Sequence, residues 1–465
     1  MSVTGTLSLA AQALKAQQLA IQTTGHNLAN ASTPGFSRQR VDFASAPPSF
    51  QGGVFVGQGV EVSAIQRVID RFAEAELLSL QGNVGYAEAQ NQALSNVQDA
   101  FPTSGGVASA LSDFFGSLSD LSNNPSGLAE RVSVIGKATA LGQSLAQTRQ
   151  ILTSAQHNLD EEITNSAQQV NGLVEQIANL NQQISLTEVR GESANDFRDQ
   201  RQTLVQELTN LTGATTREES NGEVTVTAGS LILVSGDRFA SLQTDTINAD
   251  GLHDVTYQSP SGISFDVSSI LNEGKIGSLL NSRDTQLQNF IDKLDAFAKS
   301  LVDTVNTQHG LGFDLSGNPG GNFFTPIGAS AGAAANVQVD SAIAANPRLI
   351  AAAASADSVP GDNRNALALV NLQSTSLPAL DGLTLQDSFL SLVGEIGSQA
   401  QQAQSHSDFQ QALLAQAQSR RESVSGVNID EEMTKLIAFQ RAFESSSLLV
   451  RTADQLYQSL LDMVR

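Results

Sequence analysis

The chain contains no cysteine and no tryptophan, and aromatic residues make up only 5% of its 465 residues. The missing cysteine excludes a disulfide scaffold, a thiolate zinc site and a cysteine nucleophile. Ligand pockets are usually lined with aromatic side chains, so this composition disfavours a deep pocket. No apolar run of about 18 residues occurs, which excludes a transmembrane helix. The abundant residues are Ala, Ser, Gln, Leu and Asn, a composition that suits long helices packed through small side chains.

Positive charge is also scarce, since the formal net charge is −22. Such an acidic surface repels phosphate groups and disfavours nucleic-acid binding. The first 41 residues are the exception, because no acid precedes Asp42 whereas Lys15, Arg38 and Arg40 give this segment a charge of +3. We interpret it as a segment made for contact with protein. A basic start followed by an apolar core, as in a Sec signal peptide, is absent, so we expect any export to use another route.

The N-terminal segment has the spacing of an amphipathic helix. Leu7, Leu14, Ile21 and Leu28 recur every seven residues and form a narrow apolar seam, as in a coiled coil. The helix should end near Asn30, because a helix cannot continue through Thr33-Pro34-Gly35. Beyond it, alternating valines over 54–62 around Gly57-Gln58-Gly59 predict a β-hairpin.

The C-terminal segment repeats this pattern over five heptads. One position is held by Ile429, Leu436, Phe443, Val450, Tyr457 and Val464, and the complementary one by Phe439, Ser446, Ala453 and Leu460. We expect the two terminal helices to pair with each other. Apolar residues then remain uncovered, and exposed apolar area marks an interaction face. Copies of the same chain are the simplest partner; an ordinary helical domain whose ends pack on the body is the alternative.

Between the ends, the sequence predicts a mainly α fold with a small β insert. Residues 65–123 are predicted to be helical with breaks at Pro102 and Asn123-Asn124-Pro125, and 336–360 is predicted to include a short strand. The stretch 127–190 lacks proline and has apolar residues at helical spacing, which predicts a rod-like helix or a helical hairpin. The period changes to alternation after 212, as in Glu223–Thr227. We therefore expect a terminal coiled-coil assembly domain, a rod-like helical-bundle middle domain and an inserted β domain. The assembly domain comprises 1–70 with 425–465, and the middle domain comprises 71–211 with 273–424. The β domain comprises 212–272.

No catalytic constellation is apparent. The five histidines lie apart, and none has the spacing of a metal motif. Gly57-Gln58-Gly59 lacks the third glycine of a dinucleotide-binding loop. Adjacent acids such as Glu161-Glu162 diverge on a helix and do not form a facing pair. The sequence thus predicts no enzyme, no catalytic residue, no cofactor and no metal.

Two motifs lie on the terminal seams. Asn27-Leu28-Ala29-Asn30 followed by Thr33-Pro34-Gly35-Phe36 resembles the N-terminal signature of the flagellar axial proteins, the rod, hook and hook-associated proteins. Ser425–Glu432, followed by Phe439–Phe443, resembles their C-terminal signature. Ser37-Arg38-Gln39 and Asp199-Gln200-Arg201 are similar to the hook-associated members. The resemblance is absent over 212–272.

The resemblance implies a structural subunit at the junction of hook and filament. It implies export through the flagellar type III channel without a cleaved signal peptide, and an extracellular place in the flagellum. The implied partners are copies of the chain in a ring, the hook protein, the second junction protein and an export chaperone for the C-terminal helix, without nucleic acid or membrane insertion. The expected subunit interface consists of Leu7, Leu14, Ile21, Leu28, Asn30, Thr33, Pro34, Gly35, Phe36, Ile429, Leu436, Phe439, Phe443, Val450, Tyr457, Leu460 and Val464.

Other functions stay open at this stage. The closest is another axial protein, of hook or distal-rod type. A wall hydrolase carried on an axial scaffold would need a catalytic domain, and 212–272 is short and lacks paired acids. An adhesive role of the β insert is a third alternative.

Overall fold

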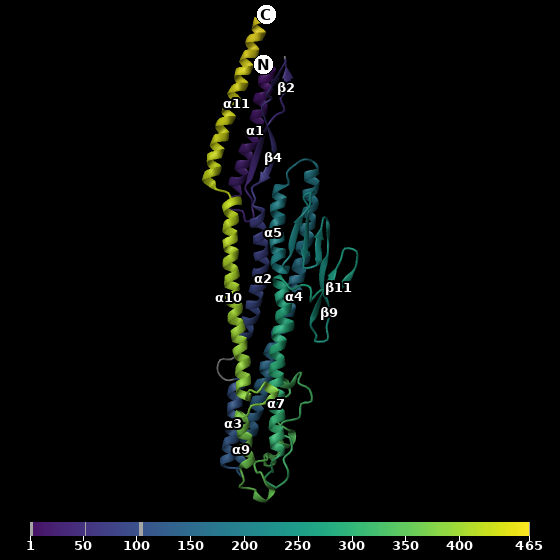
Figure 1. The fold of residues 1–465 in the computed structure, drawn as a ribbon, viewed down its shortest axis with the longest axis vertical. Helices are drawn as coiled ribbons and strands as arrows, with labels where there is room; N and C mark the ends of the chain where they lie inside the picture. Colours follow the sequence, from purple (N-terminus) through teal and green to yellow (C-terminus); the bar gives the residue numbers. More distant parts are fainter. Residues whose placement is uncertain (1–2, 52, 102–105, 465) are drawn as a thin grey trace.

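The computed structural model describes residues 3–51, 53–101 and 106–464 and shows a long, narrow molecule with a projecting arm at one end (Figure 1). Helices dominate it. They are α1 (Val3–Ala29), α2 (Arg71–Ala100), α3 (Gly106–Asn123), α4 (Leu128–Val189), α5 (Asn195–Thr212), α6 (Gly274–Asn281), α7 (Gln288–Gly310), α8 (Ser341–Ala345), α9 (Arg364–Asn371), α10 (Leu385–Ser425) and α11 (Ile429–Val464). A π-helical stretch, Ser282–Leu287, joins α6 to α7.

The strands form four small antiparallel sheets. Near the N-terminus lie β1 (Gln39–Ser45), β2 (Ser49–Gln51), β3 (Val54–Val56) and β4 (Val60–Arg67). The insert contains β5 (Thr215–Glu218), β6 (Val224–Ala228), β7 (Leu231–Ser235), β8 (Arg238–Phe239), β9 (Ser241–Ile247), β10 (His253–Gln258) and β11 (Ser264–Asp266). Their order is β5-β6-β7-β8 in one sheet and β11-β10-β9 in another. The expected mainly α fold with paired terminal helices and an inserted β part is confirmed.

The arm consists of α1, α11 and the β ribbon formed by β1 to β4. α1 packs against α11, β1 and β4, and the start of α1 and the end of α11 lie toward the tip of the arm (Figure 1). The two helices run antiparallel, since the end of α1 meets the start of α11. The arm is therefore built from segments at opposite ends of the sequence.

The body is a bundle around the 62-residue helix α4, which contacts α3, α5, α6 and α7. Its buried side chains recur at helical spacing, for example Leu152, Leu159, Ile163 and Val170, and this continuous stripe allows one helix to span the body. The predicted stretch 127–190 is thus a single rod. The long helices α2 and α10 pack along each other between the arm and the far end.

The β insert rests on the side of α4. Asn181 of α4 donates to the carbonyl oxygens of Val224 and Gly236 at 2.9 and 2.8 Å, and it accepts from the amide of Val224. Lower on the same helix, Asp160 binds the ring and the amide of His253. Between them, Asn171 donates to the carbonyl oxygen of Leu242 and accepts from its amide. Three polar anchors on α4 therefore hold the insert.

The far end of the body is closed by residues 311–363, which are mostly irregular apart from α8. This segment packs around His309 at the end of α7, which is fully buried at 0% exposure. Nδ1 of this ring is 2.7 Å from the carbonyl oxygen of Gly321, and Nε2 accepts from the amide of Ala351 at 2.9 Å. One neutral imidazole thus joins two loops. Burial lowers the pKa of His309 below its ordinary value of 6.5.

Three local predictions are wrong. The β-hairpin expected over 54–62 does not form, because β3 pairs with β2 and β4 pairs with β1. Gly59 carries the chain past α1 with φ +96°, and a Cβ there would lie 3.3 Å from Leu9. The helix expected from 65 begins at Arg71, since β4 extends to Arg67. The short strand expected in 336–360 is reduced to isolated bridges, such as Phe324 with Val339. Pro102, expected to break a helix, lies outside the described residues.

Candidate functional site

The terminal pair, α1 with α11, is the first part of the candidate site. On α11 the predicted seam turns toward α1: Leu436, Phe439, Phe443, Ser446 and Val450 are half-buried, and Ala453 is 1% exposed. On the described part of α1 the buried apolar positions are Ala10, Ala16 and Ala20. Small side chains thus set the closest packing of α1, whereas the leucines of the predicted heptad are only partly covered.

A buried hydrogen bond closes the lower end of the terminal pair. Nδ2 of Asn27 donates to Oε2 of Glu432 at 2.9 Å and to the carbonyl oxygen of Gln39 at 2.8 Å. Oδ1 of Asn27 accepts from the amide of Gln39 at 2.9 Å, and the other carboxylate oxygen of Glu432 accepts from Lys435 at 2.9 Å. Asn27 therefore holds α1, β1 and α11 together at one point.

The helix end that follows is a tight turn. Nδ2 of Asn30 donates to the carbonyl oxygen of His26 at 3.0 Å, and the amides of Thr33 and Phe36 bond to Asn30 and Thr33. Gly35 has φ +79°, and a Cβ there would lie 2.5 Å from Oγ1 of Thr203 on α5. Glycine is required here for its backbone angle and for its close approach to the body.

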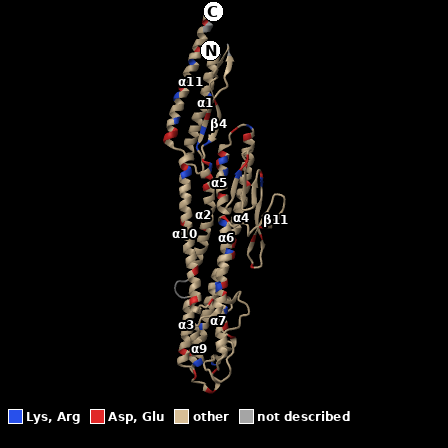
Figure 2. Cartoon of the chain, viewed as in Figure 1, with Lys and Arg blue, Asp and Glu red and all other residues tan. Residues whose placement is uncertain are grey.

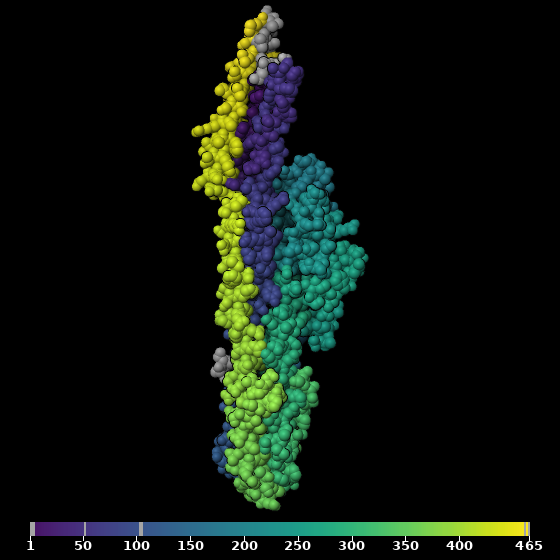
Figure 3. All heavy atoms as spheres, in the orientation of Figure 1, coloured from purple at the N-terminus to yellow at the C-terminus, as the bar shows by residue number. Residues whose placement is uncertain are grey.

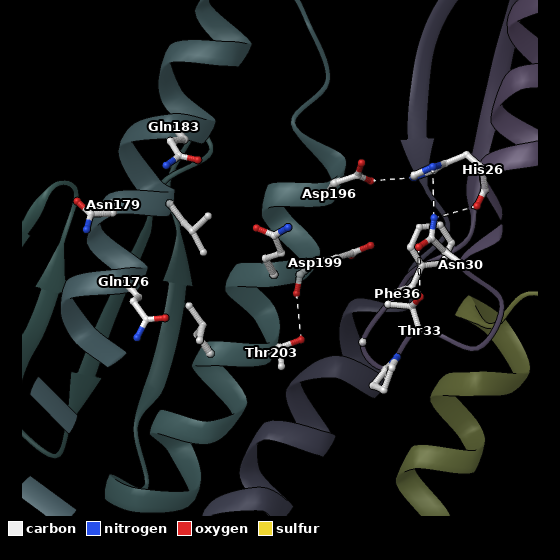
Figure 4. Close-up of a pocket in the computed structure, with 15 residues that line it drawn as sticks. His26, Asn30, Thr33, Phe36, Gln176, Asn179, Gln183, Asp196, Asp199 and Thr203 are labelled. Carbon is white, nitrogen blue, oxygen red and sulfur yellow. Dashed lines mark hydrogen bonds and ion pairs between the residues drawn. The ribbon is translucent and has the colours of Figure 1, made fainter. Parts of the chain in front are cut away.

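This turn forms one wall of a groove of about 630 Å³ that faces α4 and α5 (Figure 4). Phe36 packs edge-on against His26 with ring centroids 5.4 Å apart. The opposite wall is mostly amides, namely Gln176, Asn179 and Gln183 of α4. In the single chain, Asn30 and Thr33–Phe36 therefore lie at the contact of the arm with the body and not on the outer face of α1.

Carboxylates of α5 tie the arm to the body. Oδ2 of Asp199 accepts from the amide of Ser37 at 2.9 Å, and Oδ1 accepts from Arg67 at 2.8 Å. Oδ1 of Asp196 accepts from Gln39 at 2.7 Å and lies 3.2 Å from Nε2 of His26. Both acids are occupied by these structural contacts, so they act as clamps in this arrangement.

The link between α10 and α11 is held by arginines. Arg421 binds Glu74 of α2 at 2.7 Å and the carbonyl oxygen of Gly35 at 3.1 Å. The amide of Arg38 donates to the carbonyl oxygen of Ser425 at 2.9 Å, and its guanidinium binds Glu431 at 2.6 Å. Charged residues accordingly gather where the arm joins the body, whereas α1 has few (Figure 2). Sequence reasoning missed these pairings, although Asn27, Asp199 and Glu432 stand inside the motifs it quoted.

Away from α1, helix α11 exposes a stripe of apolar side chains. We define the outer stripe as Met433, Ile437, Leu448, Leu449 and Leu456, which are 41% to 61% exposed. Leu7, Ile429 and Tyr457 of the predicted interface are also exposed, at 43%, 53% and 50%. The side chains of Leu460 and Val464 lie outside the described part of the chain. Figure 3 shows α11 forming one flank of the arm, with no other part of the chain over it in this view.

Other chemistry finds no support among the described residues. No group of three or more His, Asp or Glu side chains within them could hold a metal ion. None of the helices in the described ranges is long and apolar enough to cross a membrane.

Comparisons with known proteins agree along the whole chain. A family model described as the helical domain of flagellar hook-associated protein FlgK matches residues 94–324. The C-terminal model of the flagellar basal body rod FlgEFG proteins matches 418–463, and the flagella basal body rod protein model matches 7–36.

Full-length relatives and a solved structure give the same result. Flagellar hook-associated protein 1 of Escherichia coli (strain K12) is 27% identical, covering 97% of this chain and 98% of that protein. The protein of that name from Bacillus subtilis (strain 168) is 28% identical, covering 98% and 97%. The flagellar hook junction protein FlgK from Burkholderia pseudomallei has a TM-score of 0.68 at 18% identity, covering 76% of this chain and all of that one. At this identity, the solved structure supports the fold.

Proposed function

The chain belongs to the flagellar hook-associated protein 1 family, and we propose that it is a structural subunit of the bacterial flagellum that forms the junction between hook and filament. The observation that carries this function is the terminal pair. It joins the two axial-protein signatures through Asn27 and Glu432 and leaves the outer stripe of α11 uncovered. Exposed apolar surface of this kind marks a site of protein–protein contact.

The expected interface residues fall into two groups within this proposal. The seam residues hold α1 to α11, and a seam that is only partly covered in one chain can be completed by neighbouring copies. Asn30 and Thr33–Phe36 act differently, because they fix the angle of the arm on α5. We assign them to positioning the arm so that its faces meet those of neighbouring subunits.

We assign a separate role to each of the three expected domains. The segments 1–70 and 425–465 assemble, and the kink at Gly426 between α10 and α11 supports a boundary there. The segments 71–211 and 273–424 form the rod, and 212–272 forms a β domain that projects from the side of α4. The rod carries the load between the arm and the far end, since α4 and α10 span 62 and 41 residues without a break.

The family consists of flagellar structural proteins that assemble with other flagellar proteins. Within it we propose three finer contacts: a ring of copies, the hook protein below and the second junction protein above. An export chaperone is proposed to cover the apolar seam of α11 before assembly, and export is proposed to use the flagellar type III route. No catalytic role is proposed, since the acids of the arm are used as structural clamps.

A deletion strain tests the function. Cells without this protein should make hooks that carry no filaments, and the wild-type gene should restore filaments. Antibody against the β insert should then label one band at the boundary between hook and filament. Label along the whole hook would instead favour a hook or distal-rod subunit.

A further inference from the structure

A second groove lies on the arm, between α1 and β4. Its volume is about 570 Å³, and no residue of α11 lines it. The apolar floor includes Leu19 and Val62, and Lys15 and Glu61 stand on its rim. β4 and α11 both pack on α1, and they flank it on opposite sides (Figure 1). The groove and the outer stripe are therefore two different faces of one arm.

The polar groups of this groove lack partners. Lys15 is the only Lys or Arg in α1, and no hydrogen bond or ion pair engages its side chain or that of Glu61 within the described part of the chain. Oε1 of Gln12, which also lines the groove, is buried without a hydrogen bond among the described atoms. Buried acceptors are normally satisfied, so this groove is suited to an incoming surface that supplies donors.

Between the apolar residues of the outer stripe, α11 carries two charges that are opposite in sign to Glu61 and Lys15. Glu444 and Arg441 are exposed on α11, and neither charged side chain has a hydrogen bond or ion pair within the described residues. Their height is fixed by the Asn27–Glu432 bond. Lys15 lies 12 positions before Asn27 and Glu444 lies 12 positions after Glu432, so in antiparallel helices both are about 18 Å up the arm at 1.5 Å per residue.

We infer that the outer stripe of one copy seats in the α1–β4 groove of the next copy, with Glu444 against Lys15 and Arg441 against Glu61. This inference rests on the proposed function and names the faces through which copies meet. The two faces differ, so the contact is heterologous, and faces at equal height fit a ring in which each copy is related to the next by a rotation. The chain's own α11 cannot supply the occupant, because it is held on another side of α1 by its seam.

Cross-linking in assembled flagella tests this contact. The chain has no native cysteine, so Lys15→Cys with Glu444→Cys introduces the only two thiols. After treatment of isolated flagella with a short bis-maleimide, we expect a ladder at multiples of 48.8 kDa. Each single-cysteine variant, and a matched pair of Lys15→Cys with exposed Ser405→Cys on α10, should give no ladder. The contact is wrong if the Lys15/Glu444 variant is present in flagella and gives no ladder either.

Charge reversal provides an independent readout. Lys15→Glu or Glu444→Lys alone places like charges together and should lower the amount of the protein in isolated flagella by at least about three-fold, as expected for an exposed pair repeated around a ring. The double variant restores opposite charges at every contact and should recover most of the wild-type amount. A double variant no better than the weaker single variant would overturn the pairing. Absence of even the wild-type protein from isolated flagella would instead refute the proposed function.

Discussion

Asn27 and Glu432 are 405 positions apart, yet they meet in a site where they are 1% and 2% exposed. A buried carboxylate is stable only when it is hydrogen-bonded and paired, and here Asn27 and Lys435 fulfil this need. The same amide binds both polar groups of the Gln39 backbone. One short side chain therefore sets the register of three segments, which an apolar residue could not do.

Replacing Asn27 by alanine should loosen the arm without unfolding the body. The change leaves Glu432 and the Gln39 backbone without this partner, at a cost of about 1–3 kcal/mol for each unsatisfied buried group. Hydrogen exchange of the α11 amides should become faster, while that of α4 stays unchanged. Gln455→Ala, at an exposed site on α11, is the control. Equal exchange in both variants would show that the bond does not hold the arm.

His309 should make the stability of the body depend on pH. Burial lowers its pKa in the folded chain below 6.5, so the unfolded chain takes up a proton at higher pH than the folded chain does. The stability that this residue contributes is complete above about pH 6.5 and is lost as the pH falls below it, by up to about 1.4 kcal/mol per pH unit. Urea unfolding at pH 7.5 and 5.5 measures this loss, which should shrink in His309→Gln. The exposed His157→Gln should keep the wild-type loss, and an unchanged loss in His309→Gln would contradict the assignment.

At the scale of elements, the close contacts are made through small residues. Gly85 of α2 lies against α5, where a Cβ would overlap the carbonyl group of Asn210. Gly82, one turn earlier, faces the backbone of Gly213. Together with the buried alanines of α1, these positions show why the chain needs so few aromatic residues: its helices approach through Gly and Ala.

Gly85→Ala should therefore destabilise the body. The extra methyl group forces α2 away from α5, and overpacking of this kind costs about 1–3 kcal/mol. Gly116→Ala is the matched control, because that helical glycine of α3 is exposed and has nothing within 4 Å of a built Cβ. The control should gain up to about 1 kcal/mol from helix propensity. If Gly85→Ala and Gly116→Ala shift the urea midpoint equally, α2 can move away from α5 without loss of stability.

The elements show what sequence could and could not predict. The seam of α11 and the rod of α4 follow from the spacing of their apolar residues, which one helix alone determines. The pairing of β1 with β4 does not, because alternation over 54–62 fits either neighbour, and both strands pack on α1, a segment distant in sequence. The outer stripe could be predicted, because its apolar residues lie on α11 outside the seam. The groove that faces β4 was not, since it exists only after α1 and the ribbon have packed.

The whole molecule divides into a body with a continuous core and an arm with a thin one. The hydrophobic cluster extends from Ala89 to Ala403 and contains none of the described side chains of α1 or α11. Isolated helices gain little stability in water, and most of it comes from packing of an apolar face. The terminal pair packs one face and leaves the outer stripe exposed. We therefore expect the arm to open locally at a free-energy cost well below that of unfolding the body.

Limited trypsin digestion should reveal this difference. Lys15, Lys435 and Arg441 are exposed in the arm, and cleavage there needs only local opening of α1 or α11. Mass spectrometry of the free chain should show loss of both ends before the body is cut, leaving a fragment close to 71–424, because the helices of the body are held by the continuous hydrophobic cluster. In isolated flagella the same arm sites should resist, since neighbouring copies then cover the outer stripe and the groove. Ends that resist as firmly as the body in the free chain would mean that the arm is stable alone, and the uncovered stripe would then no longer explain why the subunits assemble.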